Sequence, residues 1–359
     1  LHVWETYICD DKGNLIYNEQ FQILDYILYQ LKNRGIRIVL TPMSYNGGPQ
    51  TGFVYKYGGK KGCINDPESF AAQENYLFQF MKHVNPYTGI AYKDDPDIIC
   101  FEINNEPMGH SKEAGKTKNY INRMVAAMRK AGCKKPILYN FSHNIDQYPN
   151  EYSKANVQGG TYQWYPAGLF MRYPIKGNLL HTVERYDVPY GEDVKKDGNT
   201  KIIYEFSPSD CDDPSYMVPA MARTWRSNGF QFAAMYAYDK MADAAHNFHD
   251  YSHYLSFPFT PKNAMGMTIA SEIFHTVPLY KSYGVLPNNT RFEDFTIDYP
   301  NDVVEMVSEK KFFYTNSTSS KPSNLSSLFH VAGLVSSPVV SYNGSGAYFL
   351  DNLETGVWR

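Results

Sequence analysis

The stretch Ile98-Ile-Cys-Phe-Glu-Ile-Asn-Asn-Glu-Pro107 joins an apolar run to a polar turn. Its first six residues are rich in β-branched and aromatic side chains, which favour a buried strand. The residues that follow, Asn105-Glu106-Pro107, favour a turn, because Asn and Pro both adopt turn conformations readily. The stretch therefore predicts a buried strand that ends close to a carboxyl group, that of Glu106.

Helices and short apolar strands alternate on both sides of this stretch, which is typical of a parallel sheet. The helices show apolar residues at helical spacing with fitting starts and stops, such as Asp66-Pro67 before one helix and Gly35 after another. The predicted helices cover residues 18–34, a segment from 66, 119–131, 215–227 and 262–275, and the predicted strands cover 36–41, 98–103, 136–141, 157–163, 201–206 and 230–238.

Counting His2-Val-Trp4 as the end of another strand gives seven strands, whereas eight are needed to close a barrel. We therefore predict an α/β fold, a (β/α)8 TIM barrel over residues 1–286, whose first strand lies upstream of Leu1. The stretch 167–199 is loop-like, and its helix is not placed.

The sequence pattern changes from about residue 287, where helical periodicity ends. Short strand-like runs separated by Ser, Asn and Gly follow at 303–307, 311–314, 337–340 and 347–350. They predict part of an antiparallel β-sandwich. We expect residues 287–359 to form a β-rich accessory domain without catalytic residues, truncated at its end.

Composition excludes several classes of function. The net charge is −3 and no basic stripe occurs, so we expect no nucleic-acid partner. No apolar run approaches the roughly 18 residues of a membrane span. The five cysteines are an odd number without Cys-x-x-Cys spacing, which predicts buried thiols and neither a disulfide framework nor a metal cluster. The run from His246 to His253 is interpreted as an aromatic-rich loop, and we expect no metal and no cofactor.

Two glutamates lie where a barrel enzyme holds its catalytic groups, at the carboxyl ends of strands. Glu106 follows the strand 98–103, and Glu205 ends the strand Lys201-Ile-Ile-Tyr-Glu-Phe206. Hydrolysis of a glycosidic bond needs such a pair, one group to protonate the leaving oxygen and one to attack the anomeric carbon or activate water.

The motif Asn105-Glu106-Pro107 resembles the acid/base motif of clan A glycoside hydrolases, which ends strand four, with a nucleophilic Glu ending strand seven. With one strand upstream, Glu106 and Glu205 take these two places. The segments Tyr87-Thr-Gly-Ile-Ala-Tyr-Lys-Asp-Asp-Pro96 and Thr161-Tyr-Gln-Trp-Tyr-Pro166 further resemble the β-mannanase branch of glycoside hydrolase family 5.

The resemblance implies a retaining hydrolase of β-linked glycans or glycosides, with β-mannan or β-mannosides as the first guess. Glu106 would be the general acid/base and Glu205 the nucleophile. Asn105 would bind the sugar 2-hydroxyl, and Tyr165 would donate a hydrogen bond to Glu205. An oligosaccharide or polysaccharide would be the partner, and the location would be extracellular, periplasmic or at the cell surface.

Three positions depart from the family pattern: Gln163 stands for a His, Phe101 for a Trp, and the last strand lacks its Trp, for which Tyr236 is our candidate substitute. Further residues at the expected rim are candidate substrate contacts: His143, Trp164 and Trp4. For each of these rim residues, simple packing is an equal alternative.

Other readings remain open at the level of sequence. Asn105 could be a plain turn residue, and Glu102 points into the barrel as a structural carboxylate. The whole chain could be a β-glucanase or β-galactosidase type of enzyme, or an inactive carbohydrate-binding barrel. Retention of both glutamates argues against the inactive alternative. The mode of attack, endo or exo, and the oligomeric state are left open.

Overall fold

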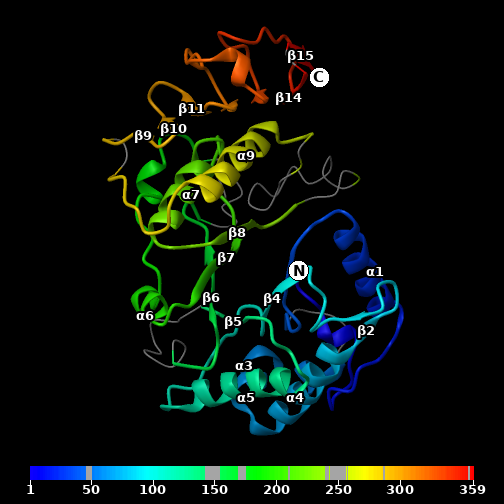
Figure 1. The fold of residues 1–359 in the computed structure, drawn as a ribbon. Helices are drawn as coiled ribbons and strands as arrows, with labels where there is room; N and C mark the ends of the chain where they lie inside the picture. Colours follow the sequence, from blue (N-terminus) through cyan, green and yellow to red (C-terminus); the bar gives the residue numbers. More distant parts are fainter. Residues whose placement is uncertain are drawn as a thin grey trace. The chain divides into compact units, whose positions relative to one another are not determined.

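The computed structural model of the protein describes residues 1–45, 51–141, 154–168, 175–208, 211–238, 242, 256, 258–285, 288–354 and 356–359. These residues form two compact units. The first unit comprises Leu1–Tyr162 and Pro189–Ile202, and the second comprises Gln163–Val188 and Ile203–Arg359. Each unit is described in turn (Figure 1).

A six-stranded sheet in the order β1-β4-β5-β6-β7-β8 provides the framework. Parallel pairing joins β1 to β4, β4 to β5 and β5 to β6, as the alternation of helices and strands predicted. The strands β6 and β7 each begin in the first unit and end in the second. The bounds are β1 Ile38–Leu40, β4 Ile98–Glu102, β5 Ile137–Asn140, β6 Gly159–Trp164, β7 Thr200–Phe206 and β8 Phe232–Met235.

Two of the three long helices of the first unit, α1 and α4, begin at a side-chain cap. Helix α1, Glu19–Asn33, begins after Asn18, whose side chain accepts a hydrogen bond from the Phe21 amide at 3.1 Å. Helix α4, Pro67–Lys82, begins after Asp66, which caps the Glu68 amide at 2.9 Å. Helix α5, Lys116–Lys130, packs on α4. All three were predicted from apolar periodicity.

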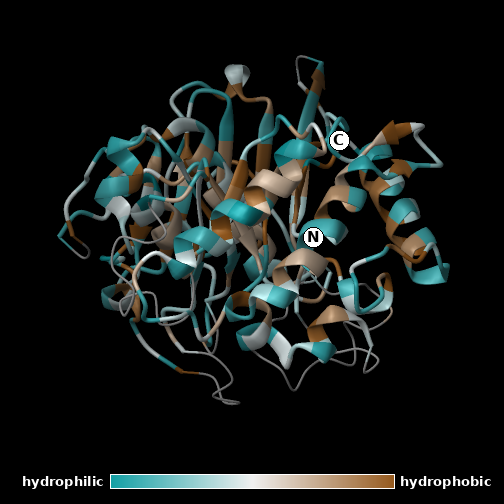
Figure 2. Ribbon diagram, turned by 90° about the horizontal axis from the view of Figure 1, so that it is seen from below, coloured by the Kyte–Doolittle hydropathy of each residue, from teal (hydrophilic) through white to brown (hydrophobic). Residues whose placement is uncertain are grey.

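Shorter elements escaped prediction, because two to seven residues are too few to show a periodic pattern. In Figure 2 both strands and helices carry brown, apolar stretches and teal, polar ones. The unpredicted elements of the first unit are η1 Glu5–Tyr7, α2 Gly52–Lys56, α3 Gly59–Asn65, α6 Gly191–Lys196 and the hairpin β2 Val84–Asn85 with β3 Ile90–Ala91.

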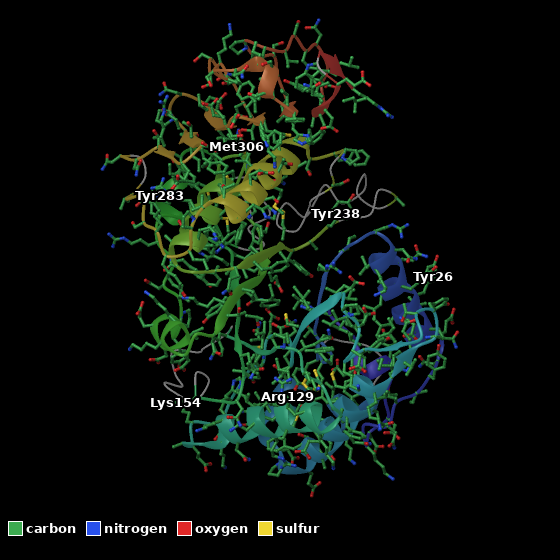
Figure 3. All side chains as sticks on the ribbon, viewed as in Figure 1. Tyr26, Arg129, Lys154, Tyr238, Tyr283 and Met306 are labelled. Atoms are coloured by element: carbon green, nitrogen blue, oxygen red, sulfur yellow. The ribbon has the colours of Figure 1, made fainter. Side chains whose placement is uncertain are left out.

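Arg129, labelled on α5 in Figure 3, ties this helix to the sheet. Its guanidinium donates to the carbonyls of Cys133 and Lys135 at 2.8 and 2.7 Å and to Oε1 of Gln158 at 2.5 Å. The same Oε1 accepts the Ile137 amide at the start of β5. One side chain thus sets where α5 ends relative to β5 and β6.

In the second unit, helices α7, Met217–Ser227, and α9, Pro261–Thr276, pack on each other. Trp225 of α7 is fully buried and lies edge-on to Phe206 of β7, with ring centroids 4.7 Å apart. A short helical turn, η3 Leu180–Thr182, precedes them in the chain. Both long helices were predicted from the sequence.

The C-terminal part of this unit is one seven-stranded sheet in the order β15-β14-β13-β12-β11-β10-β9. It contacts α9, and Lys311 of β12 pairs with Glu272 of α9 at 2.7 Å. Met306 of β11, labelled in Figure 3, is buried. The bounds are β9 Arg291–Phe292, β10 Phe295–Asp298, β11 Val303–Val307, β12 Lys311–Tyr314, β13 His330–Gly333, β14 Tyr348–Glu354 and β15 Val357–Trp358.

Two details of this sheet differ from the prediction. The sheet is mixed, because β12 and β13 pair in parallel, whereas purely antiparallel strands were expected. The chain between them is long and includes the turn η4 Leu325–Ser327, so it crosses over where a tight hairpin would have reversed direction. Residues 337–340 form no strand, since the Ser337 amide donates to the Val340 carbonyl within a local turn. No second sheet facing this one occurs in the described part of the chain.

His2 forms a single parallel bridge with Thr41, beside β1. It is an isolated bridge, whereas the sequence predicted a strand end. Four of the five cysteines are buried free thiols and Cys211 is partly buried, as predicted, and burial raises the pKa of the Cys100 thiol to about 12. Among the described residues, no helix has the length and hydropathy of a membrane span.

Candidate active site

The segment after β4 remains pinned to neighbouring strands up to Glu106. The Ile103 amide donates to the Leu138 carbonyl at 3.0 Å, and the Asn105 amide donates to the Met43 carbonyl at 2.9 Å. Glu106 itself has a φ of +46°, in the left-handed region that non-glycine residues rarely adopt. Such a conformation costs about 1–2 kcal/mol. Six non-glycine residues among those described have a positive φ, and Glu106, the predicted acid/base, is one of them.

Buried amide side chains surround this turn. Asn105 is 3% exposed, and its Oδ1 atom accepts no hydrogen bond from the described residues. Asn104 is fully buried and donates through Nδ2 to the hydroxyls of Tyr45 and Tyr120, at 3.2 and 3.0 Å. Asn104 is therefore fixed through Nδ2 from α5 and from the segment after β1, and the Oδ1 atoms of both Asn104 and Asn105 accept no hydrogen bond from the described residues.

Glu102, which ends β4, lies in a fully buried polar cluster. Its Oε2 accepts from Thr41 Oγ1 at 2.7 Å, and its Oε1 accepts from Asn140 Nδ2 at 3.0 Å and from Thr161 Oγ1. Burial raises the pKa of Glu102 to about 7, although these three donors oppose that shift. The contacts join β4 to β5, to β6 and to Thr41 just after β1, which fits the structural alternative for this carboxylate.

A lysine lies beside Glu106. Nζ of Lys60, in the short helix α3, is 3.4 Å from Glu106 Oε2, and the two side chains are 16% and 25% exposed. His2 also interacts electrostatically with both Glu106 and Lys60, and burial lowers the pKa of His2 to about 4. Neither Lys60 nor His2 was predicted, because no motif marks either residue in the sequence.

In the second unit, Glu205 near the end of β7 is 8% exposed and accepts a hydrogen bond from the Tyr165 hydroxyl through Oε1. The contact predicted for these two residues is present. A hydroxyl that donates to a carboxylate favours its ionised form. The backbone around the pair is pinned as well, since the Tyr236 amide donates to the Phe206 carbonyl at 2.8 Å and the Ser207 amide to the Trp164 carbonyl at 3.4 Å.

The two residues before Tyr165 differ in what they contact. The Trp164 ring stacks on Tyr186 with centroids 4.6 Å apart and meets Trp225 of α7 edge-on at 5.5 Å. These are the contacts expected of the packing alternative for Trp164. Gln163 comes just before Trp164 in β6, and its carbonyl accepts a hydrogen bond from the Tyr186 hydroxyl at 2.8 Å.

Two further candidate substrate contacts, Tyr236 and Trp4, are exposed. Tyr236 is 41% exposed and Trp4 is 51% exposed, with the Trp4 ring stacked on Tyr7 at 5.8 Å. Their roles in substrate binding stay predictions. His143 and the run 246–253 lie outside the described residues.

Comparison with known proteins places these features in a family. The family described as Cellulase (glycosyl hydrolase family 5) matches residues 2–230 of the chain. Mannan endo-1,4-beta-mannosidase 1 of Solanum lycopersicum is 29% identical over 148 residues, covering 36% of this chain and 37% of that protein. Mannan endo-1,4-beta-mannosidase 2 of Arabidopsis thaliana is 30% identical over 128 residues, covering 30% and 28%. The match thus spans well under half the length of either relative.

Solved structures agree at the level of fold. The endo-beta-1,4-mannanase from Thermotoga petrophila superimposes with a TM-score of 0.58 at 16% identity, over 82% of this chain and 74% of that one. The resemblance to the β-mannanase branch that the sequence motifs predicted is confirmed by the two mannan endo-1,4-beta-mannosidases. Because the family match covers well over half of the chain, this protein belongs to glycosyl hydrolase family 5.

Proposed function

We propose that this protein is a retaining glycoside hydrolase that cleaves β-linked glycans, with β-1,4-mannan as the first candidate substrate. The observation that carries the proposal is the pairing of Tyr165 with the buried carboxyl group of Glu205 at the end of β7. A hydroxyl donor favours the ionised form of such a carboxyl group, the form that acts as a nucleophile. The mannan-degrading relatives support the choice of sugar.

The proposed reaction has two steps. In the first, Glu106 donates its proton to the leaving oxygen while a carboxylate oxygen of Glu205 bonds to the anomeric carbon, and the glycosidic bond breaks. In the second, water attacks the same carbon, its proton passes to Glu106, and the ester bond to Glu205 breaks. Each step inverts the anomeric centre, so the product keeps the configuration of the substrate.

Three further features support the assignment of Glu106 and its neighbour. Glu106 follows β4 in a turn that its neighbours hold by backbone hydrogen bonds, and it keeps a strained left-handed conformation. The unsatisfied Oδ1 of Asn105 offers an acceptor for a sugar hydroxyl, the role that the family resemblance implies. A buried acceptor that a sugar hydroxyl satisfies discriminates well against ligands that lack this hydroxyl.

A substrate panel tests the proposal. The purified protein is incubated with aryl β-mannoside, β-glucoside and β-galactoside and with β-mannan and β-glucan, and the products are sized. We expect hydrolysis of mannan-type substrates by the wild type and none by Glu205→Ala. Equal activity of Glu205→Ala and wild type, or hydrolysis of none of these substrates, would contradict the proposal. An extracellular or cell-surface location belongs to the same proposal, because polymeric glycans occur there.

A further inference from the structure

Lys60 lies beside the proposed acid/base, a group that must both give up and take a proton. Its Nζ atom is 3.4 Å from Glu106 Oε2, and both side chains are largely buried. An ammonium at this distance favours the ionised form of a carboxyl group, and it does so more strongly than at an exposed site because water screens the pair less.

The position of Lys60 is set by the contacts that hold its helix, α3, in place. Its helix, α3, is fixed to α4 because the Cys63 carbonyl accepts from Ser69 Oγ and from Gln73 Nε2, both at 2.7 Å. The same helix is fixed to the turn after Glu106, because Asn65 Nδ2 donates to the Gly109 carbonyl at 2.7 Å. The helix that carries Lys60 is therefore held to the segment that carries Glu106.

The turn and the helix also approach closely. Gly109 has a φ of +71°, and a Cβ atom built there would lie 3.0 Å from Cγ of Lys61. A larger residue at this position would press on the residue next to Lys60. This close approach is a second feature that keeps α3 against the turn.

Within the part of the first unit that the structure describes, Lys60 from α3 and His2 from the segment that bridges to Thr41 both interact with Glu106. Burial lowers the pKa of His2 to about 4, so His2 is neutral above about pH 5. In the proposed reaction the negative charge of Glu205 would act on Glu106 in the opposite sense to Lys60. Of the cationic side chains described beside Glu106, Lys60 is the one within ion-pair distance, at 3.4 Å.

We propose that Lys60 is a positioning residue of the reaction, one that holds the Glu106 carboxyl group in place and sets the balance between its acid and base forms. The inference rests on the proposed function of Glu106. In the first step Lys60 makes the proton easier to release, and in the second it favours the carboxylate that accepts the proton of water. A cation in this place therefore sets the pH above which the free enzyme no longer holds the proton.

The test is the pH dependence of kcat/KM for an aryl β-mannoside with a poor leaving group, which needs the proton. The alkaline limit of this profile reports the acid group of the free enzyme. We expect Lys60→Met and Lys60→Gln to move the alkaline limit upward by about one pH unit, since the loss of a neighbouring opposite charge makes protonation easier. Lys60→Arg keeps the charge and should leave the limit in place.

Lys61→Met is the matched control, because it removes the same charge from the next residue of α3. Lys61 is exposed and forms no ion pair among the described residues. We expect the profile of this variant to coincide with that of the wild type. Profiles of Lys60→Met and Lys60→Gln that coincide with that of Lys61→Met would overturn the inference.

Failure of the proposed function gives a different result. Glu106→Ala should still react in the first step with an aryl glycoside that has a good leaving group, and added azide should restore turnover. If azide fails to do so, the role of Glu106 is wrong, whatever the profiles of the Lys60 variants show. If azide rescues Glu106→Ala and the Lys60 profiles do not move, only the role of Lys60 is wrong.

Discussion

At the scale of single residues, the hydroxyl of Tyr165 is the contact that most directly shapes Glu205. Tyr165→Phe keeps the ring and removes the donor. A hydrogen bond to a charged group contributes about 1.5–3 kcal/mol, so we expect kcat/KM to fall by about ten- to a hundredfold. Steady-state kinetics on an aryl β-mannoside measures the change.

Tyr186→Phe is the matched control for this prediction. It removes a tyrosine hydroxyl from the same unit, one that donates to the backbone carbonyl of Gln163. We expect this variant to keep kcat/KM within about threefold of the wild type, since the bond it removes joins two neutral groups and does not reach Glu205. Equal losses in the two variants would show that the tyrosine at position 165 acts only through packing.

At the scale of elements, two buried carboxyl groups make the free energy of unfolding depend on pH. Glu102 joins β4 to its neighbours, and Glu5 accepts the amides of Ser44 and Tyr45 at 2.8 and 3.0 Å. Burial raises the pKa of both from 4.5 to about 7. The folded state therefore binds more protons than the unfolded state between these pH values, and the free energy of unfolding falls as pH rises from 4.5 to 7.

Glu102→Gln removes one of these protonation sites. A tenfold difference in proton affinity between the folded and unfolded states corresponds to about 1.4 kcal/mol. The raised pKa of Glu102 therefore accounts for about 3 kcal/mol of the fall in the free energy of unfolding between pH 4.5 and 7. We expect urea unfolding of Glu102→Gln at pH 4.5, 6 and 7.5 to show a smaller pH dependence than the wild type, with the fall from Glu5 remaining. A variant with the wild-type slope would contradict the protonation of Glu102 in the folded protein.

Arg223 of α7 fixes the segment that follows α9. Its buried guanidinium donates to the carbonyls of Asn289 and Gly284, both at 2.7 Å, and to that of Tyr283 at 3.3 Å. Figure 3 labels Tyr283. Arg223→Met leaves these carbonyls without their donor, and we expect it to lower the free energy of unfolding by about 2–4 kcal/mol. Urea denaturation measures this change, with the exposed Arg291→Met as control, and equal midpoints for the two variants would refute the role of Arg223.

At the scale of the whole molecule, most of the predicted helices and strands came from apolar periodicity, and the predicted site residues came from the ends of strands. The long helices and the parallel strands repeat over enough residues to be recognised, and the Tyr165–Glu205 contact followed from a short motif. Lys60 could not be found in this way, because α3 has seven residues and reaches Glu106 only through contacts distant in sequence. The parallel pairing of β12 and β13 was missed for a related reason, since the crossover between them has no periodic pattern.

The central claim, double displacement by Glu106 and Glu205, fixes the stereochemistry of the first product formed. Retaining enzymes hold the two carboxyl groups about 5–5.5 Å apart and pass through a covalent intermediate, whereas inverting enzymes hold them about 6.5–9.5 Å apart and admit a water molecule. Proton NMR of the sugar released in the first minutes, before mutarotation, distinguishes the two outcomes. The account predicts the β-anomer from a β-linked substrate, and the α-anomer as first product would contradict it.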